Sequence, residues 1–170
     1  MEQMQVYIVN LGKYNEGISQ GAWFNLPVAY EVVAEKIGLN KQYEEYAIHD
    51  YEAPFKISEF NNLDFLNRIA NQIEEKQGNP AIDYLDKFVE DGWYENFEDA
   101  LDGIGAVHIC ENCSTMQDVA IEFVESQSYY SDMPSIISFN INYEAVAKQL
   151  ADEGYYYVTG DGIVFQRFEG

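Results

Sequence analysis

His108, Cys110 and Cys113 form the one pattern in the sequence that resembles a metal or redox site. A Cys-x-x-Cys pair provides half of a tetrahedral zinc site, and the chain has two cysteines in all, so a second pair would have to come from a second copy. Glu111 lies between the two cysteines and disfavours the thiolate that metal binding or redox chemistry requires. The sequence therefore predicts two buried, unreactive cysteines and neither a metal ion nor a cofactor.

Other catalytic patterns are also missing from the sequence. The two histidines, His49 and His108, lack the serine or cysteine context of a nucleophilic triad. Gly160-Asp-Gly162 is typical of a hairpin turn rather than a phosphate-binding loop, and no stretch has the alternating Asp and Asn residues of a calcium-binding loop. Carboxylates are so common that no pair stands out as a general acid and base. We predict that the protein is not an enzyme.

Carboxylates are the main chemical feature of the chain. It has 30 Asp and Glu residues against 9 Lys and Arg residues, which gives a net charge of −21. The stretch Tyr43–Glu52 is a compact example, with four carboxylates, three tyrosines and no Lys or Arg. With 170 residues, 47% of them hydrophobic and 15% aromatic, the chain has the composition of one folded domain or two or three very small ones, not of a disordered acidic tail.

This charge excludes one class of partner and favours another. Nine scattered cations cannot form the basic patch that nucleic-acid binding requires, so we expect no nucleic acid as ligand. Duplex DNA carries one charge per roughly 1.7 Å of axis, so the net charge of this chain matches the phosphates of about ten base pairs. A basic groove that normally holds nucleic acid would therefore fit this surface. Three alternatives stay open: solubility, adaptation to salt, and binding to another basic protein.

The sequence also indicates where the protein acts. It has no run of about 18 apolar residues, and its first residues do not show the basic and then apolar pattern of a signal peptide. We therefore expect no membrane association and a cytoplasmic protein, and the low cysteine content agrees with a reducing compartment.

Three predicted segments follow from hydrophobic periodicity. In the first, strands are predicted over residues 5–11, 21–26 and 46–51, with a loop over 13–21 and a helix from Pro27 to Ile37. In the second segment, a first helix is defined by the spacing of Leu63, Leu66, Ile69 and Ile73. A second helix runs from Pro80 to Gly92, with Ile82, Leu85 and Val89 inward, and a third helix covers residues 96–101.

The third segment again mixes strands and helices. We predict strands over 106–110 and 135–141, and a hairpin of 155–158 and 163–166 around Thr159-Gly-Asp-Gly162. Between them we predict a helix capped by Ser114 or Thr115, with Gln117 placed for a capping box and Phe123 inward, and another helix over 143–150. The predicted class is α+β in three small units. Residues 1–61 form an antiparallel sheet with one helix, residues 62–104 are acidic and helical, and residues 105–170 form an antiparallel sheet with two helices.

Five blocks of the N-terminal unit form a recognisable series: Tyr7–Gly17, Gly21–Phe24, Ile37–Leu39, Tyr43–Glu52 and Pro54-Phe55. Over about the first 55 residues, their order and spacing resemble those of the ArdA family of antirestriction proteins. Further on, Tyr143–Ala145, Leu150 and Gly162–Phe165 are similar to the C-terminal antirestriction region of the family. There the chain has Ala147-Lys148-Gln149 where the family usually has Gly-Arg-Asp.

The resemblance implies a fold and a function. It implies an elongated, three-part DNA mimic encoded on a mobile genetic element, which occupies the DNA-binding groove of type I restriction-modification enzymes and blocks restriction and often modification. It also implies a homodimer joined head to head through the C-terminal unit.

Carboxylates on all three units are the candidates for phosphate positions. The net charges of the units are −5, −8 and −8, so the hypothesis needs no single dominant residue. The candidate partner-binding residues are Glu44, Glu45, Asp50, Glu52, Asp64, Glu74, Glu75, Asp83, Asp86, Glu90, Asp91, Glu95, Glu98, Asp99, Asp102, Asp118, Glu122, Glu125 and Asp132.

Aromatic residues suggest where a dimer forms and which residues make the core. The C-terminal hairpin has more aromatic area than a small sheet buries alone, unless the two helices of that unit cover it, so the candidate dimer interface is Tyr155, Tyr156, Tyr157 and Phe165. By contrast, Trp23, Phe24, Tyr43 and Tyr46 are predicted to be core residues. Strand alternation predicts Tyr46, Ile48 and Asp50 on one face and Ala47, His49 and Tyr51 on the other.

Overall fold

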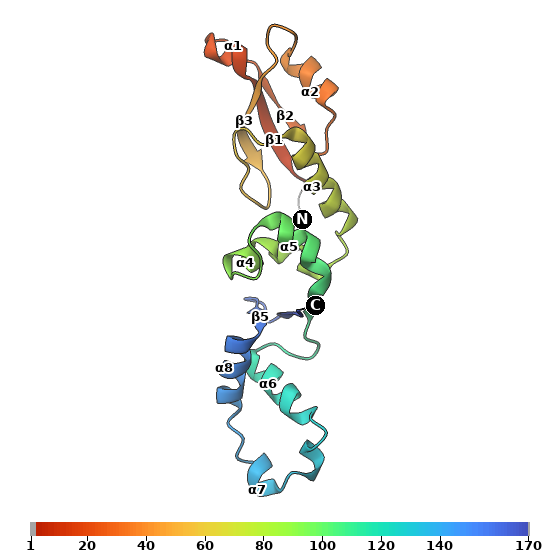
Figure 1. Cartoon of the computed structure of the whole chain (residues 1–170), viewed down its shortest axis with the longest axis vertical. Helices are drawn as coiled ribbons and strands as arrows, with labels where there is room; N and C mark the ends of the chain where they lie inside the picture. Colours follow the sequence, from red (N-terminus) through yellow and green to blue (C-terminus); the bar gives the residue numbers. More distant parts are fainter. Residues whose placement is uncertain (1–2, 170) are drawn as a thin grey trace.

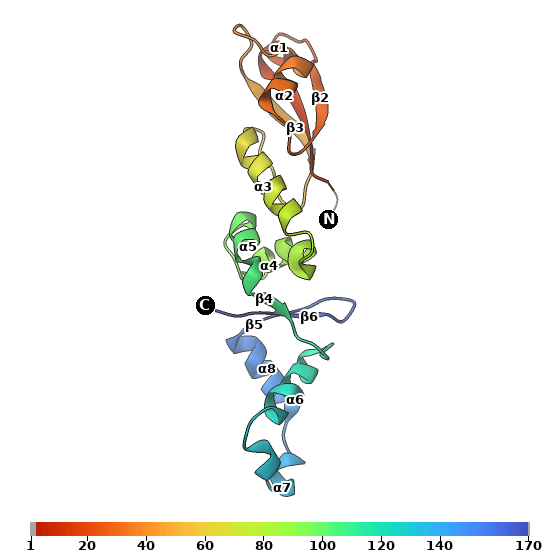
Figure 2. The ribbon, with the colours of Figure 1, turned by 90° about the vertical axis from the view of Figure 1, so that its right-hand side faces the viewer.

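A computed structural model describes residues 3–169 as an elongated chain of packed elements (Figures 1 and 2). A three-stranded antiparallel sheet lies at one end, helices follow along the long axis, and a second three-stranded antiparallel sheet precedes a helical tip at the other end. This arrangement confirms the predicted α+β class, with a sheet in each outer part and helices in the middle.

The N-terminal sheet has the order β2-β1-β3, from β1 (Gln5–Asn10), β2 (Gly21–Asn25) and β3 (Tyr46–Glu52). On its inner face Val6 and Ile8 are fully buried beside Val33 and Ile37 of helix α2 (Tyr30–Ile37). The sequence predicts that this helix starts at Pro27, but it begins three residues later, at Tyr30. It ends as predicted at Gly38, whose left-handed backbone conformation suits glycine.

Two predictions for this unit are wrong. Residues expected in a loop form the short helix α1 (Leu11–Asn15), because the Asn10 side chain accepts a hydrogen bond from the Lys13 N–H and caps it. The expected strand alternation breaks at a bulge: Tyr7 pairs with Asp50, but the next residue, Ile8, pairs with Ile48. Asp50 and Ile48 therefore face opposite sides of the sheet rather than the same side.

The middle part consists of helices that pack end to end (Figure 2). Helix α3 (Leu63–Glu75) buries Leu63, Leu66, Ile69 and Ile73, as the periodicity predicts. The predicted second helix is a 3₁₀ helix, η1 (Pro80–Tyr84), followed by α4 (Leu85–Glu90), and α4 buries Phe88 more completely than Val89. Helix α5 (Phe97–Gly103) follows, and η2 (Ile104–Ala106) leads into the second sheet.

The second sheet has the order β4-β6-β5, from β4 (Val107–Ile109), β5 (Tyr155–Val158) and β6 (Val164–Arg167). Beyond it lie α6 (Met116–Glu125) and α8 (Tyr143–Glu153), with η3 (Tyr130–Asp132) and α7 (Ser135–Ser138) at the tip (Figure 1). The cap of α6 is Thr115, and its capping box uses Asp118 instead of Gln117.

The predicted strand over residues 135–141 is wrong, because the segment folds as α7 at the tip of the molecule. Backbone N–H groups of Ile137, Ser138 and Phe139 donate to the carbonyl oxygens of Pro134 and Ser135. These local hydrogen bonds satisfy the backbone without a neighbouring strand. A run of β-branched and aromatic residues thus forms a helical turn that leaves its apolar side chains exposed.

One apolar core joins all three parts. Its buried residues form a continuous cluster from Met4 and Val6 through Leu66 and Phe88 to Phe165. The joint between the middle helices and the second sheet is aromatic: Phe88 stacks on Trp93 at 4.5 Å and meets the edge of Phe165 at 5.6 Å. The predicted boundary at residue 104 falls within η2, and the core crosses both this boundary and the one at residue 61.

We predict that Phe165→Ala destabilises the protein by about 3–5 kcal/mol, because the fully buried ring leaves a cavity at this joint. Phe168→Ala is the matched control: Phe168 is close in sequence but 52% exposed, and its loss changes the free energy of unfolding by about 0.5 kcal/mol or less. Urea unfolding followed by circular dichroism measures both. If both substitutions lowered the free energy of unfolding equally, the stabilising role of Phe165 at this joint would be contradicted.

Candidate functional site

The predicted partner-binding carboxylates lie on every part of the chain and mostly face solvent. All of them are exposed except Asp86, Glu98 and Asp118, which are half-buried. Glu44, Glu45, Asp50 and Glu52 lie on or beside β3, at one end of the long axis, and the rest follow on α3, η1, α4, α5, α6 and η3 toward the other end. The structure therefore spreads negative charge along the molecule instead of gathering it in one pocket.

Helix starts explain how the fold tolerates several of these acids. Asn62, Asn79 and Asn96 cap α3, η1 and α5 with their side chains, and each of these helices has acidic residues in its first turn. Carboxylates near a helix N-terminus are stabilised by its partial positive charge. Asp64, Asp83 and Asp99 in these first turns are exposed, and Glu98 is half-buried.

Few of the carboxylates are neutralised by a cation. Among the described residues, Arg68 pairs with Glu98, Lys87 with Asp86 and Glu90, and Lys148 with Asp152. Two further cations bind backbone carbonyl oxygens instead: the Lys76 ammonium lies 2.6 Å from Leu101 O, and the Arg167 guanidinium donates to Trp93 O. These cations hold helices and the second sheet together and leave the acidic surface uncompensated.

Some of the predicted residues also have structural roles. The Gln72 side-chain amide donates to Asp102 at 3.0 Å, and the Asn96 amide donates to Asp99 at 2.8 Å. Asp118 accepts hydrogen bonds from the N–H groups of Ser114 and Thr115, which lower the pKa of its carboxyl group. Substitution of these residues would change the fold as well as the charge.

Sequence reasoning left out several acids that are as exposed as the predicted ones. Glu31 and Glu35 lie one turn apart on α2, and α8 and its neighbourhood add further carboxylates: Glu144, Asp152, Glu153 and Asp161. The helical spacing of Glu31 and Glu35, opposite the buried Val33 and Ile37, was the signal in the sequence that could have found the first two.

Of the two cysteines predicted to be buried, Cys113 is buried and Cys110 is half-buried, and the acid beside the Cys113 thiol is Glu122 rather than Glu111. Cys113 is 7% exposed, and its thiol lies 3.1 Å from Glu122 Oε2. Burial and the Glu122 carboxylate raise the pKa of Cys113 to about 12, and burial raises the pKa of Cys110 above its usual value. From the sequence, Glu111 is the acid expected to disfavour the thiolate. Within residues 3–169 no group of three or more His, Cys, Asp and Glu side chains could hold a metal ion.

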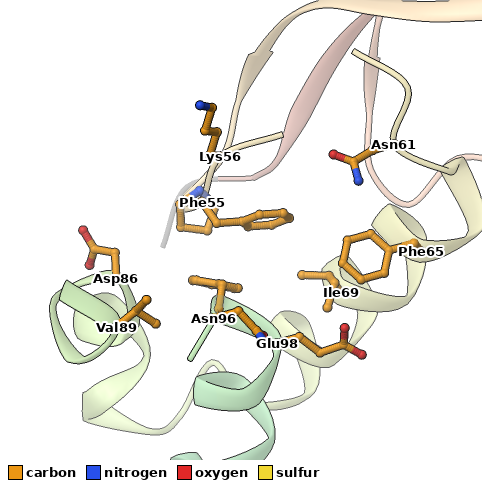
Figure 3. A pocket seen from close by; sticks show the side chains of 11 residues that line it. Phe55, Lys56, Asn61, Phe65, Ile69, Asp86, Val89, Asn96 and Glu98 are labelled. Carbon is orange, nitrogen blue, oxygen red and sulfur yellow. The ribbon is translucent and has the colours of Figure 1, made fainter. Parts of the chain in front are cut away.

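A pocket of about 460 Å³ lies where the segment after β3 meets α3, α4 and α5 (Figure 3). Figure 3 shows the Phe55 ring pointing into it, with Phe65 on one side and Val89 on another. The carboxylates of Asp86 and Glu98 at its rim already pair with Lys87 and Arg68. The residues that line it include no histidine, cysteine or serine.

The predicted dimer residues are largely covered within one chain. Phe165 is fully buried against Phe88 and Tyr84, and Tyr155, Tyr156 and Tyr157 are half-buried. The middle helices cover this aromatic area, in addition to the helices of the C-terminal unit that the sequence suggested. Phe165 is thus a core residue in this structure, and the most exposed apolar side chains of this unit lie on the tip instead: Ile136 at 77% and Phe139 at 85%.

The N-terminal aromatics also divide differently from the prediction. Phe24 is buried, and Tyr43 and Tyr46 are half-buried, but Trp23 is 45% exposed. Trp23 pairs with Tyr7 on the outer face of the sheet, while Phe24 pairs with Val6 on the inner face. The alternation of β2 therefore places the larger aromatic ring in solvent.

The protein-family model described as Antirestriction protein (ArdA) matches residues 6–165 of the chain. The match begins in β1 and ends in β6. No curated protein matches the chain. Separately, no helix among the described residues has the length and apolar character needed to span a bilayer.

We predict that Cys113 reacts with a thiol reagent such as DTNB at pH 8 at least about tenfold more slowly in the folded than in the urea-unfolded protein, because a raised pKa lowers the thiolate fraction. Glu122→Gln should raise the rate, since it removes the nearby negative charge. The measurement uses a Cys110→Ser background, so that only Cys113 reports. If Glu122→Gln left the reaction rate of Cys113 unchanged, the effect of Glu122 on the pKa of Cys113 would be contradicted.

Proposed function

Since the chain belongs to the ArdA family of antirestriction proteins, we propose that it occupies the DNA-binding groove of type I restriction-modification enzymes as a charge and shape mimic of duplex DNA. On this proposal it blocks restriction and often modification, and it is carried by a mobile genetic element. The observation that carries the proposal is the distribution of exposed carboxylates over all parts of an elongated body.

Two features support mimicry over an ordinary solvated surface. Ordinary surfaces intersperse both signs of charge, whereas here the units carry −5, −8 and −8. Two of the nine cations, Lys76 and Arg167, bind the backbone carbonyl oxygens of Leu101 and Trp93 instead of a carboxylate. Exposed carboxylates therefore follow the body from the N-terminal sheet to α6, whereas the tip beyond it is nearly uncharged. The field of such carboxylates speeds encounter with a basic groove and selects partners by sign.

We further propose a homodimer joined through the C-terminal unit, which doubles the length of the mimic. Two copies of a chain with a net charge of −21 repel each other, so they can meet only where carboxylates are sparse. Residues 126–143 contain one acid, Asp132, and no base. In the structure this segment forms the tip and exposes Ile136, Ile137, Phe139 and Tyr129. The tip is the main surface that we propose for the second copy, together with the exposed parts of the half-buried Tyr155, Tyr156 and Tyr157.

Reversal of four fully exposed acids, Glu74, Glu75, Asp91 and Glu95, to Lys should abolish inhibition without unfolding the protein. Each reversal adds two charges, so the net charge changes from −21 to −13. A single change such as Glu95→Gln should have little effect, because one exposed charge contributes at most about 1 kcal/mol. Protection of unmodified phage DNA in a restricting host measures the outcome.

The control for this experiment exchanges Glu and Asp at the same four positions, which keeps the charge and should keep inhibition. Affinity for the purified enzyme should also fall between low and high salt. Full inhibition by the reversed protein, or an affinity that does not depend on salt, would contradict mimicry. The plating assay also separates antirestriction from the alternatives of another basic partner or of salt adaptation, neither of which protects the phage.

For the dimer, we predict that Ile136→Ser with Phe139→Ser converts a dimer into a monomer in analytical ultracentrifugation. Both side chains are exposed, so the fold should persist. Phe60→Ser, at a 69% exposed residue in the N-terminal unit, is the control and should leave the dimer intact. A truncation near residue 104 is unsuitable because it would uncover Phe88. A dimer that survives the double substitution would exclude the tip as the interface.

A further inference from the structure

The outer face of the N-terminal sheet combines exposed aromatic rings with carboxylates. Tyr7 on β1, the central strand, lies directly between Trp23 on β2 and Asp50 on β3, and Gln5 lies between Asn25 and Glu52. Residues paired across antiparallel strands point to the same side of a sheet. The β-bulge after Tyr7 is what brings Asp50 to this side. We call these six residues the outer face.

The Trp23 ring and the two acids of the outer face are exposed to solvent, and the Tyr7 ring is half-buried. Trp23 is 45% exposed and contacts Tyr7 with ring centroids 5.6 Å apart. Asp50 and Glu52 are exposed, and neither forms an ion pair with any residue in the described range 3–169. Asp50 Oδ1 accepts the Tyr51 N–H at 2.8 Å, which leaves its other oxygen for a partner.

An aromatic ring beside a carboxylate is a binding arrangement for arginine. The guanidinium group stacks on the face of a tryptophan or tyrosine ring, and its N–H groups donate to the carboxylate. The same chain uses both contacts internally. Arg167 lies 4.3 Å from the Tyr94 ring centroid and 4.9 Å from that of Tyr155, and Arg68 lies 5.3 Å from the Phe65 ring while it pairs with Glu98.

The charge of the outer face decides between possible occupants. A second copy would bring its own carboxylates against Asp50 and Glu52, and a purely apolar partner would leave them desolvated and unpaired. A basic partner satisfies both the acids and the rings. The face also belongs to the same unit as the candidate phosphate positions Glu44 and Glu45.

We propose that the outer face of the β2-β1-β3 sheet binds an arginine side chain of the partner enzyme, with the guanidinium against Trp23 and Tyr7 and hydrogen-bonded to Asp50. This inference rests on the proposed function and adds a short-range anchor to its long-range electrostatics. Exposed tryptophan and tyrosine side chains often dominate the affinity of protein interfaces, whereas rim charges mainly affect the association rate.

The test uses the full-length protein and a purified type I restriction-modification enzyme, with dissociation rates measured at two salt concentrations. Trp23→Ala should dissociate about tenfold faster, with an unchanged salt dependence because no charge is lost. Trp23→Phe should give an intermediate rate, since it keeps a ring. Asp50→Asn should weaken binding and reduce the salt dependence. Phe60→Ala, which removes another exposed ring of the same unit, should behave like wild type.

The outcomes separate this inference from the proposed function. If wild type binds and Trp23→Ala binds equally tightly, the arginine anchor is wrong while charge mimicry stands. If wild type does not bind the enzyme, the proposed function fails, and titration with a tri-arginine peptide tests the outer face alone. Trp23 fluorescence should then change with arginine peptide more than with tri-lysine, and Trp23→Phe, which keeps only the buried Trp93, should lose the response. Equal responses to both peptides would overturn the inference.

Discussion

Repulsion among carboxylates is the constraint on which the rest of this structure depends. A net charge of −21 favours expansion of a compact chain, and an elongated body places the charges farther apart than a sphere would. The fold also meets the constraint locally, since acids occupy the first turns of helices where the partial positive charge stabilises them. The same arrangement that reduces repulsion within the chain presents a linear array of charge to a basic groove.

An elongated body needs stiff joints, and here apolar and cationic contacts provide them. The core continues from the N-terminal sheet to Phe165, so no part is linked to its neighbour by a bare linker. Arg167 stacks between Tyr94 and Tyr155 and donates to the Trp93 carbonyl at the joint between the helices and the second sheet. A cation placed there stabilises the joint without neutralising a surface carboxylate.

The proposed partner-binding carboxylates are therefore spread over the surface, and two local surfaces differ from the rest. The outer face of the N-terminal sheet combines rings with unpaired acids, and the tip around α7 is apolar and nearly uncharged. The N-terminal sheet and the tip around α7 lie at opposite ends of the long axis (Figure 1). They suit different partners, a basic one at the first end and a second copy at the other.

The sequence by itself determined the sign and density of the charge, the class of fold, the family and most of the elements. Composition is independent of conformation, and periodicity shows which side of an element is apolar, as for Leu63, Leu66, Ile69 and Ile73 on α3. Periodicity does not show what covers that side. Only the tertiary structure decided that Phe165 packs against Phe88, that a bulge turns Asp50 to the outer face beside Trp23, and that residues 135–138 form a helix at a tip with exposed side chains. The first two features depend on contacts between residues distant in sequence, and the third depends on the lack of a strand for residues 135–138 to pair with. The local pattern of apolar and polar residues contains neither kind of information.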